Sequence, residues 1–397
     1  MAPEPLDGGE ARNRRARIAV AALFLTNGAL FANLLPRYPE IKTDLAMSNA
    51  AYGAAVASFS AGALLAGPAA GALIRRFQSA WVALVTTVAL AVLILSAGVA
   101  ATPIVFAAAL FAAGACDAVT DVAQNVNGLR LQRNYGRSII NSLHAIWAVG
   151  AIVGGLMGAG AIALHVPRSV HLGTAAVLFS GVVVAAYPYL LHGPDHDDHP
   201  STRNPDGTGL RATVLLALLA FVGIAVAGAT VEDAGSSWAT LYLRDSLGAP
   251  GAVAVLGYVA LVGSMFVGRI LGDRLVDRFG ERAIARSGGL ITVVGMGAAL
   301  AFPSVPGTIA GFAAAGLGVA TVVPAAMRAA DELPGLRAGT GLTILTWLMR
   351  VGFLGAPLIV GLVADATSLR AGLLTVPVAG VALILLAGAL TARRRTN

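Results

Sequence analysis

Charged residues are scarce in this chain. Only 12% of its 397 residues are Asp, Glu, Lys or Arg, about half of the roughly 25% typical of soluble globular domains. A chain of this length with so little charge has no way to hide its apolar surface in water. The composition therefore argues against an ordinary water-soluble enzyme or binding module.

Cysteine and the short motifs of catalysis are also lacking. A single cysteine, Cys116, excludes an intramolecular disulfide, and we interpret it as a small helix-packing residue. A GxxxxGK[ST] phosphate-binding loop is absent, which argues against nucleotide-driven work. No polar domain is large enough to hold a Ser-His-Asp arrangement or a metal centre. We therefore expect neither an enzyme nor a cofactor.

Apolar residues are what the chain has in excess, at 57%. At the length of a membrane span, about 20 residues, the sequence predicts an all-α membrane protein with twelve transmembrane helices in two six-helix pseudo-symmetric bundles. The expected spans are 18–35, 50–73, 82–101, 104–126, 140–164, 172–190, 212–231, 253–271, 287–302, 309–327, 342–363 and 373–390.

The longest polar stretch divides the chain. We expect an N-terminal tail at 1–17, a six-helix bundle at 18–191, a linker at 192–210, a second bundle at 211–392 and a tail at 393–397. The linker's His192, His196 and His199 lie among aspartates, a composition that also suits zinc. Because no second ordered element fixes a geometry there, we expect no metal.

Arginine placement predicts the orientation, because positive charge gathers in loops that stay cytoplasmic. One set of ends holds most arginines, including Arg75, Arg76, Arg274, Arg278 and the run 393–395, whereas the other set holds few basic residues. Both termini and the linker are therefore expected on the cytoplasmic side of the cytoplasmic (inner) membrane. The net charge of +7 then reflects topology, and we expect the lipid bilayer as a partner and no nucleic acid.

The loop after the eighth expected span carries a recognisable pattern. Residues 272–280 read GDRLVDRFG, which resembles the cytoplasmic signature of the major facilitator superfamily. The resemblance implies a gating latch formed by Arg274, Asp277, Arg278 and Gly280. The equivalent loop of the first half has Arg75 where the acidic residue is expected, followed by Arg76. A symmetric two-latch model is therefore not supported, and a solvated basic loop is the favoured interpretation of these two arginines.

A narrower resemblance covers most of the chain. It rests on residues 36–42, 121–125, 136–147, 232–243 and 352–361, which look like the MosC/YbjJ-like branch of the major facilitators, a branch similar to the fucose–proton symporter group. It implies transport of a small polar solute such as a sugar or cyclitol, and it places a membrane-embedded acidic residue at Asp121. Gln132, Ser237 and Arg350 depart from the expected pattern.

The fourth expected span has one polar face, because Asp117, Asp121 and Asn125 recur every four residues. Charges at this depth are costly and usually mark a solute or ion pathway. A poorly solvated carboxyl group suits a proton carrier that loads and unloads near neutral pH. We assign proton coupling to Asp121, with Asp117 as its competitor. The alternative is a structural ion pair with Arg350, which interrupts the apolar run 342–363.

Other candidate solute contacts are spread over both halves. The seventh expected span ends near Glu232, and a helix break before Trp238 would expose backbone groups to a solute. Trp238 suits stacking on a sugar ring or an interfacial belt equally well. Arg350 itself suits a carboxylate or phosphate of the solute. Further candidates are Asn125, Asn33, Trp347 and His144, whereas Gly150, Gly154, Gly155 and Gly158 indicate a helix-packing seam.

These observations predict a secondary active transporter that works by alternating access, with a small-molecule solute and protons as partners and a monomer as the functional form. Two alternatives stay open: a drug or metabolite–proton efflux antiporter, and a membrane solute sensor that does not transport. The sequence leaves the solute and the direction of transport undetermined.

Overall fold

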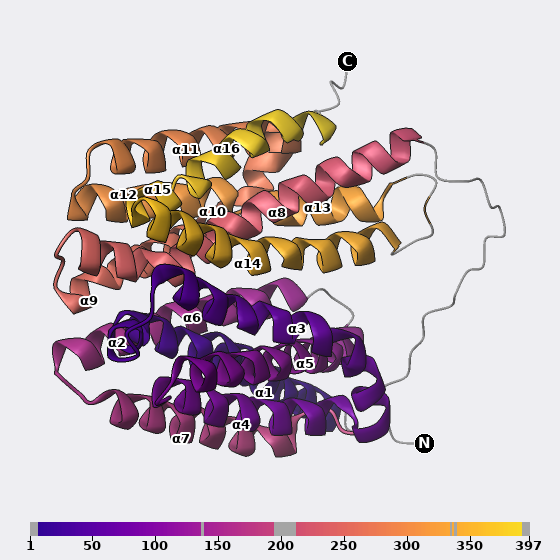
Figure 1. The fold of residues 1–397 in the computed structure, drawn as a ribbon. Coiled ribbons are helices and arrows are strands. Elements are labelled where there is room, and N and C mark those ends of the chain that lie inside the picture. Colours follow the sequence, from indigo (N-terminus) through magenta and orange to yellow (C-terminus); the bar gives the residue numbers. More distant parts are fainter. Residues whose placement is uncertain (1–6, 136–138, 194–211, 334–335, 337–339, 391–397) are drawn as a thin grey trace, which may run out of the picture. The chain divides into compact units, whose positions relative to one another are not determined.

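The computed structural model describes residues 7–135, 139–193, 212–333, 336 and 340–390. Within those residues every regular element is a helix (Figure 1). Among the described residues, twelve helical segments are long and apolar enough to cross a membrane, which confirms the predicted class and number of spans. Most of the expected linker lies outside the described residues, and so do His196 and His199.

The helices follow the apolar runs in chain order. Their bounds are α1 (Asp7–Leu34), η1 (Leu35–Arg37), α2 (Tyr38–Asp44), α3 (Asn49–Phe77), α4 (Ser79–Gly98), α5 (Pro103–Tyr135), α6 (Ile140–Ala163), α7 (Arg168–Ala186), η2 (Tyr187–Tyr189), α8 (Ala212–Leu241), η3 (Tyr242–Ser246), α9 (Gly251–Ala254), α10 (Leu256–Phe279), α11 (Glu281–Ala301), α12 (Val305–Val319), α13 (Val322–Asp331), α14 (Thr340–Ala366), α15 (Leu369–Gly372), α16 (Thr375–Leu386) and η4 (Ala387–Ala389).

Several helices run on past the predicted apolar spans. Helix α5 has 33 residues, which at about 1.5 Å per residue gives roughly 50 Å, well beyond a hydrocarbon layer of about 30 Å. Its extra turns carry Arg130 and Arg133. The predicted span 104–126 covers the apolar part of α5, and the polar extension follows it.

The chain forms two compact units. Unit 1 contains residues 1–37 and 58–198, and unit 2 contains residues 38–57 and 199–397. Residues 38–57 come from the first half of the sequence, yet they pack within unit 2, so helix α3 contributes to both units. The predicted domain bounds place this segment in the first bundle, and they stay a prediction about how the chain is organised in the membrane.

In unit 1, α1 packs most extensively on α6, and glycine makes this close approach possible. A Cβ added to Gly28 would lie 2.2 Å from the Trp147 carbonyl oxygen, and one added to Gly150 would lie 2.1 Å from the Leu25 carbonyl oxygen. A Cβ added to Gly154 would lie 2.4 Å from the Ala29 carbonyl oxygen, also in α1. The packing seam expected in the fifth span is confirmed at Gly150 and Gly154, since only a residue without a side chain fits there.

In unit 2, α8 lies against α14, α16 and α13, while α12 packs on α10 and α11. The first turns of α3 dock onto α14: a Cβ at Gly53 would lie 2.2 Å from the Pro357 carbonyl oxygen, and one at Gly361 would lie 2.4 Å from the Asn49 carbonyl oxygen. The Asp365 carboxylate also accepts hydrogen bonds from the first two amides of α3, at 2.9 and 2.8 Å.

The seventh span differs from its prediction. Helix α8 continues without a break through Glu232 and Trp238 to Leu241, and the irregular turn comes later, as the π-helical segment Tyr242–Ser246. No proline interrupts this stretch, and Gly235 serves close packing, since a Cβ there would lie 2.2 Å from a Leu261 methyl carbon. The expected helix break before Trp238 was therefore wrong.

Candidate functional site

The polar face predicted for the fourth span is present on helix α5. Asp117, Asp121 and Asn125 are all half-buried. The Asn125 amide donates to the Asp121 carboxylate at 3.0 Å and to the Asp121 backbone carbonyl at 2.8 Å. Gln124 donates to the same carboxylate at 3.3 Å. Two of the three residues are therefore joined directly, as the four-residue spacing predicts.

The Asp117 carboxylate is hydrogen-bonded to a side chain of helix α1. The side chain of Asn27, which is only 4% exposed, donates to the Asp117 carboxylate at 2.8 Å. The carbonyl of the same amide accepts a bond from the Trp147 indole of α6 at 2.9 Å. One amide thus links three helices, and its acceptor and donor are both used.

His144 extends the hydrogen-bonded chain on the other side. Its Nε2 lies 3.2 Å from the Asn125 side-chain oxygen, and the edge-to-face contact with Phe24 places the two ring centroids 5.2 Å apart. His144 is exposed within unit 1. We call Asn27, Asp117, Asp121, Asn125, His144 and Trp147 the polar array.

The array combines two carboxyl groups with two amides, an indole and an imidazole. Residues four apart on a helix have Cβ atoms about 5–6 Å apart. Two negative charges at about 6 Å repel by roughly 3 kcal/mol at an effective dielectric constant of 20. Protonation of either carboxyl group removes this repulsion and converts an acceptor into a donor. The geometry is therefore suited to binding a proton and to contacting a solute rich in hydroxyl or amide groups.

Sequence reasoning missed two members of the array, Asn27 and Trp147. Asn27 lies in the apolar run of the first span, and a buried amide there must find a partner. That signal was available, but the partners lie 90 and 120 residues away in the sequence. Their identity comes only from the packing of α1 against α5 and α6.

Asn33 lies in a separate buried cluster at the other end of α1. Its side-chain oxygen is 2.8 Å from His171 Nε2, and the Arg37 Nε donates to His171 Nδ1 at 3.3 Å. Because Nδ1 accepts, Nε2 carries the proton of a neutral ring and donates to Asn33. Arg37 also donates to the Val166 carbonyl at 2.8 Å. These bonds tie α1 to the start of α7.

In unit 2 the acidic pair of α8 is enclosed. Asp233 is 8% exposed and accepts a bond from Ser237 at 3.3 Å, whereas Glu232 is half-buried. Trp238 is fully buried and meets Tyr52 edge to face, with ring centroids 4.9 Å apart. The Tyr52 hydroxyl donates to the Ser237 carbonyl at 2.6 Å.

The other unit 2 candidates are more accessible. Trp347 is 53% exposed and Arg350 is half-buried, both on α14. They share a helix and lie three residues apart, so their side chains fall on neighbouring parts of one face. Their assignment to solute binding stays a prediction.

The expected gating residues lie at helix ends and are mostly exposed. Arg75 and Arg76 end α3, and Arg274, Asp277 and Arg278 lie on the last turns of α10. Gly280 joins α10 to α11 with φ of 84° and ψ of 154°, a region that essentially only glycine occupies. Next to it, Glu281 pairs with Arg328 at 3.5 Å. The latch role stays a prediction.

Comparisons with known proteins agree with this architecture. Residues 20–275 match the family model described as Major Facilitator Superfamily. An uncharacterized transporter, y4wD, of Sinorhizobium fredii (strain NBRC 101917 / NGR234) is 32% identical over 88% of this chain and 92% of its own length. The membrane protein MosC of Rhizobium meliloti is 32% identical over 91% of this chain and 87% of its own.

A solved structure shares the fold. The crystal structure of the nucleoside transporter NupG superposes with a TM-score of 0.72, covering 94% of this chain and 98% of that one at 13% identity. At that identity the likeness concerns the fold alone. Twelve spans, a family model that matches well over half of the chain and two relatives at 32% identity lead to one conclusion: the chain belongs to the major facilitator superfamily.

Proposed function

We propose that this major facilitator is a proton-coupled secondary transporter of a small polar solute, such as a sugar, cyclitol or related compound. The observation that carries the proposal is the polar array. Its two carboxyl groups, on adjacent turns of α5, accept hydrogen bonds from amide side chains of α1 and α5, and those amides are bonded in turn to His144 and Trp147 of α6. Charged groups inside a span are costly and are kept for pathways of ions or solutes.

Asp121 is the proposed proton carrier, and Asp117 is its competitor. Asp121 accepts bonds from two amide side chains, Gln124 and Asn125, and Asn125 in turn contacts His144. When the Asp121 carboxyl binds a proton it gains a donor, so the amides that point at it lose an ionised acceptor. The orientation of Asn125 and His144 then depends on whether the proton is bound. This dependence supports coupling, since His144 and Asn125 are candidate solute contacts.

Unit 2 contributes further candidates. Glu232, Trp238, Trp347 and Arg350 are proposed solute contacts, and Asn33 is proposed in unit 1. Trp238 and Asn33 are buried in the described conformation, so their role requires a rearrangement of the helices around them. Alternating access supplies such a rearrangement, because each unit moves largely as a body during the cycle. A functional monomer with both termini and the linker in the cytoplasm completes the proposal.

The test is proton movement into weakly buffered proteoliposomes that contain the purified protein and a pH-sensitive dye. A panel of sugars, cyclitols, nucleosides, organic acids and cationic drugs is added one at a time. Proton entry with one polar solute, lost in Asp121→Asn or Asp117→Asn, is the expected result. Asp245→Asn is the matched control, because this exposed carboxylate pairs with its neighbour Arg244 outside the array.

Each alternative has its own outcome. Proton movement opposite to a cationic drug identifies an efflux antiporter and contradicts the symport proposal. A solute that raises the melting temperature without crossing the membrane identifies a sensor. Coupled proton entry that survives both Asp→Asn substitutions shows that the array does not carry the proton.

A further inference from the structure

A basic pocket opens at one end of unit 1, away from the polar array. Its volume is about 300 Å³, and it is bounded by the first turns of α1, the last turns of α5 and the chain that follows η2. The charged residues around it are Arg12, Arg130 and Arg133, accompanied by Asn13, Asn134 and His192. None of the residues that the structure places around the pocket is acidic.

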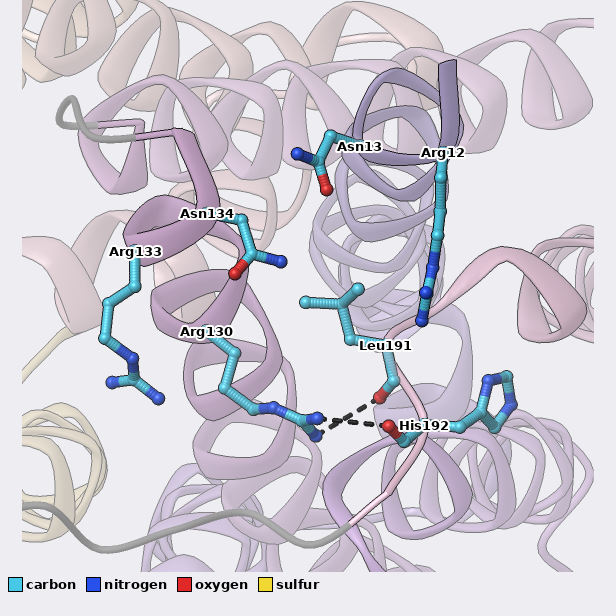
Figure 2. Close-up of a pocket in the computed structure, with 7 residues that line it drawn as sticks. All are labelled: Arg12, Asn13, Arg130, Arg133, Asn134, Leu191 and His192. Atoms are coloured by element: carbon cyan, nitrogen blue, oxygen red, sulfur yellow. Dashed lines mark hydrogen bonds between the residues drawn. The ribbon is translucent and has the colours of Figure 1, made fainter. Parts of the chain in front are cut away.

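Arg130 fixes one wall of the pocket (Figure 2). Its guanidinium donates to the backbone carbonyls of Leu191 at 3.3 Å, His192 at 3.1 Å and Gly193 at 3.1 Å. These bonds fasten the chain after η2 to helix α5. Figure 2 shows Arg12 extending from α1 toward the same stretch of chain. Arg12 and Arg133 are exposed, so their guanidinium groups are accessible from outside.

The pocket lies at the depth of lipid headgroups. Arg12 precedes the apolar run of α1, which starts at Ile18, by six residues, and Arg133 follows the last apolar residue of the α5 run, Val126, by seven. At about 1.5 Å per residue these arginines are roughly 9 to 11 Å beyond the hydrocarbon. The headgroup layer is about 5–8 Å thick on each side, and an arginine side chain spans the difference.

Aromatic side chains independently mark the same level. Trp81 is 47% exposed and meets Tyr187 with ring centroids 6.0 Å apart, and Tyr187 contacts the His192 ring at 4.9 Å. Tyr189, two residues after Tyr187, is 52% exposed. Exposed tryptophan and tyrosine gather at the membrane–water interface. His192 belongs both to this aromatic group and to the pocket wall, so the pocket opens beside the interface.

We propose that this pocket binds the phosphate group of an anionic phospholipid, with Arg12 and Arg133 as its charged ligands and Asn13 and Asn134 as amide donors. Guanidinium groups match phosphate oxygens with paired hydrogen bonds, and an anionic leaflet supplies the phosphate at this depth. A bound lipid would connect α1 to α5 and to the start of the linker. The proposal does not depend on proton coupling or on the identity of the solute.

The experiment titrates phosphatidylglycerol into lipid-depleted protein in detergent micelles and counts bound lipid by native mass spectrometry. Phosphatidylcholine is the zwitterionic comparison. Arg12→Gln/Arg133→Gln is the test variant, and Arg14→Gln/Arg15→Gln is the matched control, because it removes the same charge from exposed positions outside the pocket. Arg130 is left intact because it fastens the chain. A melting temperature confirms that each variant is folded.

We expect the test variant to bind phosphatidylglycerol about thirtyfold more weakly, at about 1 kcal/mol for each arginine, and the control to change less than threefold. If the double variant does not fold, Arg12→Gln alone replaces it, and we expect this variant to bind phosphatidylglycerol about fivefold more weakly than wild type. Equal losses in test and control would assign binding to diffuse surface charge and overturn the pocket. Binding of phosphatidylcholine as tight as that of phosphatidylglycerol would overturn it too.

A second arm separates the two sources of phosphate. Inorganic phosphate is titrated up to millimolar concentrations while the melting temperature is followed in wild type and in the test variant. We expect no saturable shift. A saturable shift that requires Arg12 and Arg133, together with displacement of phosphatidylglycerol, would overturn the lipid as occupant and assign the pocket to a soluble phosphate compound.

Discussion

Replacing Asn27 by leucine tests whether the polar array holds unit 1 together. Asn27 is 4% exposed and makes two bonds to other helices, one to Asp117 at 2.8 Å and one from Trp147 at 2.9 Å. Leucine has a similar volume but neither bond. The variant therefore leaves the Trp147 N–H and one carboxylate oxygen of Asp117 without these partners, while the surrounding packing changes little.

The expected cost follows from those two bonds. Hydrogen bonds between helices in membranes contribute about 0.6 kcal/mol on average and up to about 1.7 kcal/mol. Two bonds, one of them to a carboxylate, give a destabilisation of about 1–3 kcal/mol. Within that sum, the bond between Asn27 and Trp147 should appear as a coupling energy of about 0.6–1.7 kcal/mol in a double-mutant cycle with Trp147→Phe.

The assay is reversible unfolding in mixed micelles, followed by far-ultraviolet circular dichroism. This signal reports helix content, so Trp147→Phe does not remove it. Asn127→Leu is the matched control. Asn127 is also buried, in α5, but its side-chain amide donates to Ser79 at 3.1 Å and to the Leu191 carbonyl at 2.9 Å, and neither partner is Trp147. Its cycle with Trp147→Phe should be additive. A coupling energy below about 0.3 kcal/mol for Asn27, or one that Asn127 reproduces, would refute the reasoning.

Three further predictions concern backbone geometry, and all are measured as melting temperatures in detergent. Gly150→Leu should prevent stable folding, because the new Cβ alone would lie 2.1 Å from a carbonyl oxygen of α1. The control Gly160→Ala places its Cβ in open space and should be neutral or stabilising by up to about 1 kcal/mol. Asp365→Ala should cost about 0.5–2 kcal/mol, since this carboxylate caps the first turn of α3; no change would show that water replaces the cap. Gly280→Ala should cost about 1–3 kcal/mol because its φ of 84° is strained for alanine, and an unchanged melting temperature would contradict that conformation.

The membrane architecture could be predicted from the sequence because lipid imposes a strong constraint. A segment that crosses hydrocarbon must be apolar over about 20 residues and must satisfy its backbone as a helix. The twelve apolar runs therefore predicted the twelve candidate membrane-spanning segments found among the described residues. The stripe of Asp117, Asp121 and Asn125 was equally readable, since residues four apart share a helix face. The glycines of the fifth span also pointed correctly to a close helix contact.

Other features depend on contacts between residues far apart in the chain. The local sequence shows that Asn27 needs a partner but not that the partners are Asp117 and Trp147, because these are set by the packing of α1 against α5 and α6. The continuation of α8 past Glu232 was not predicted for a related reason. The polar residues there indicated a helix end, but packing around Gly235 and Trp238 keeps the helix intact.

By itself the sequence thus determined that this protein resides in a lipid bilayer, that it is helical, and which helix face carries its carboxyl groups. Each of these follows from composition or from local periodicity. The tertiary structure decided which partners those carboxyl groups meet, that residues 38–57 pack within unit 2, and that the ends of α1 and α5 line a basic pocket together with the chain after η2. The physical reason is that hydrocarbon selects helices segment by segment, whereas hydrogen bonds and glycine contacts between helices are settled only when distant segments pack together.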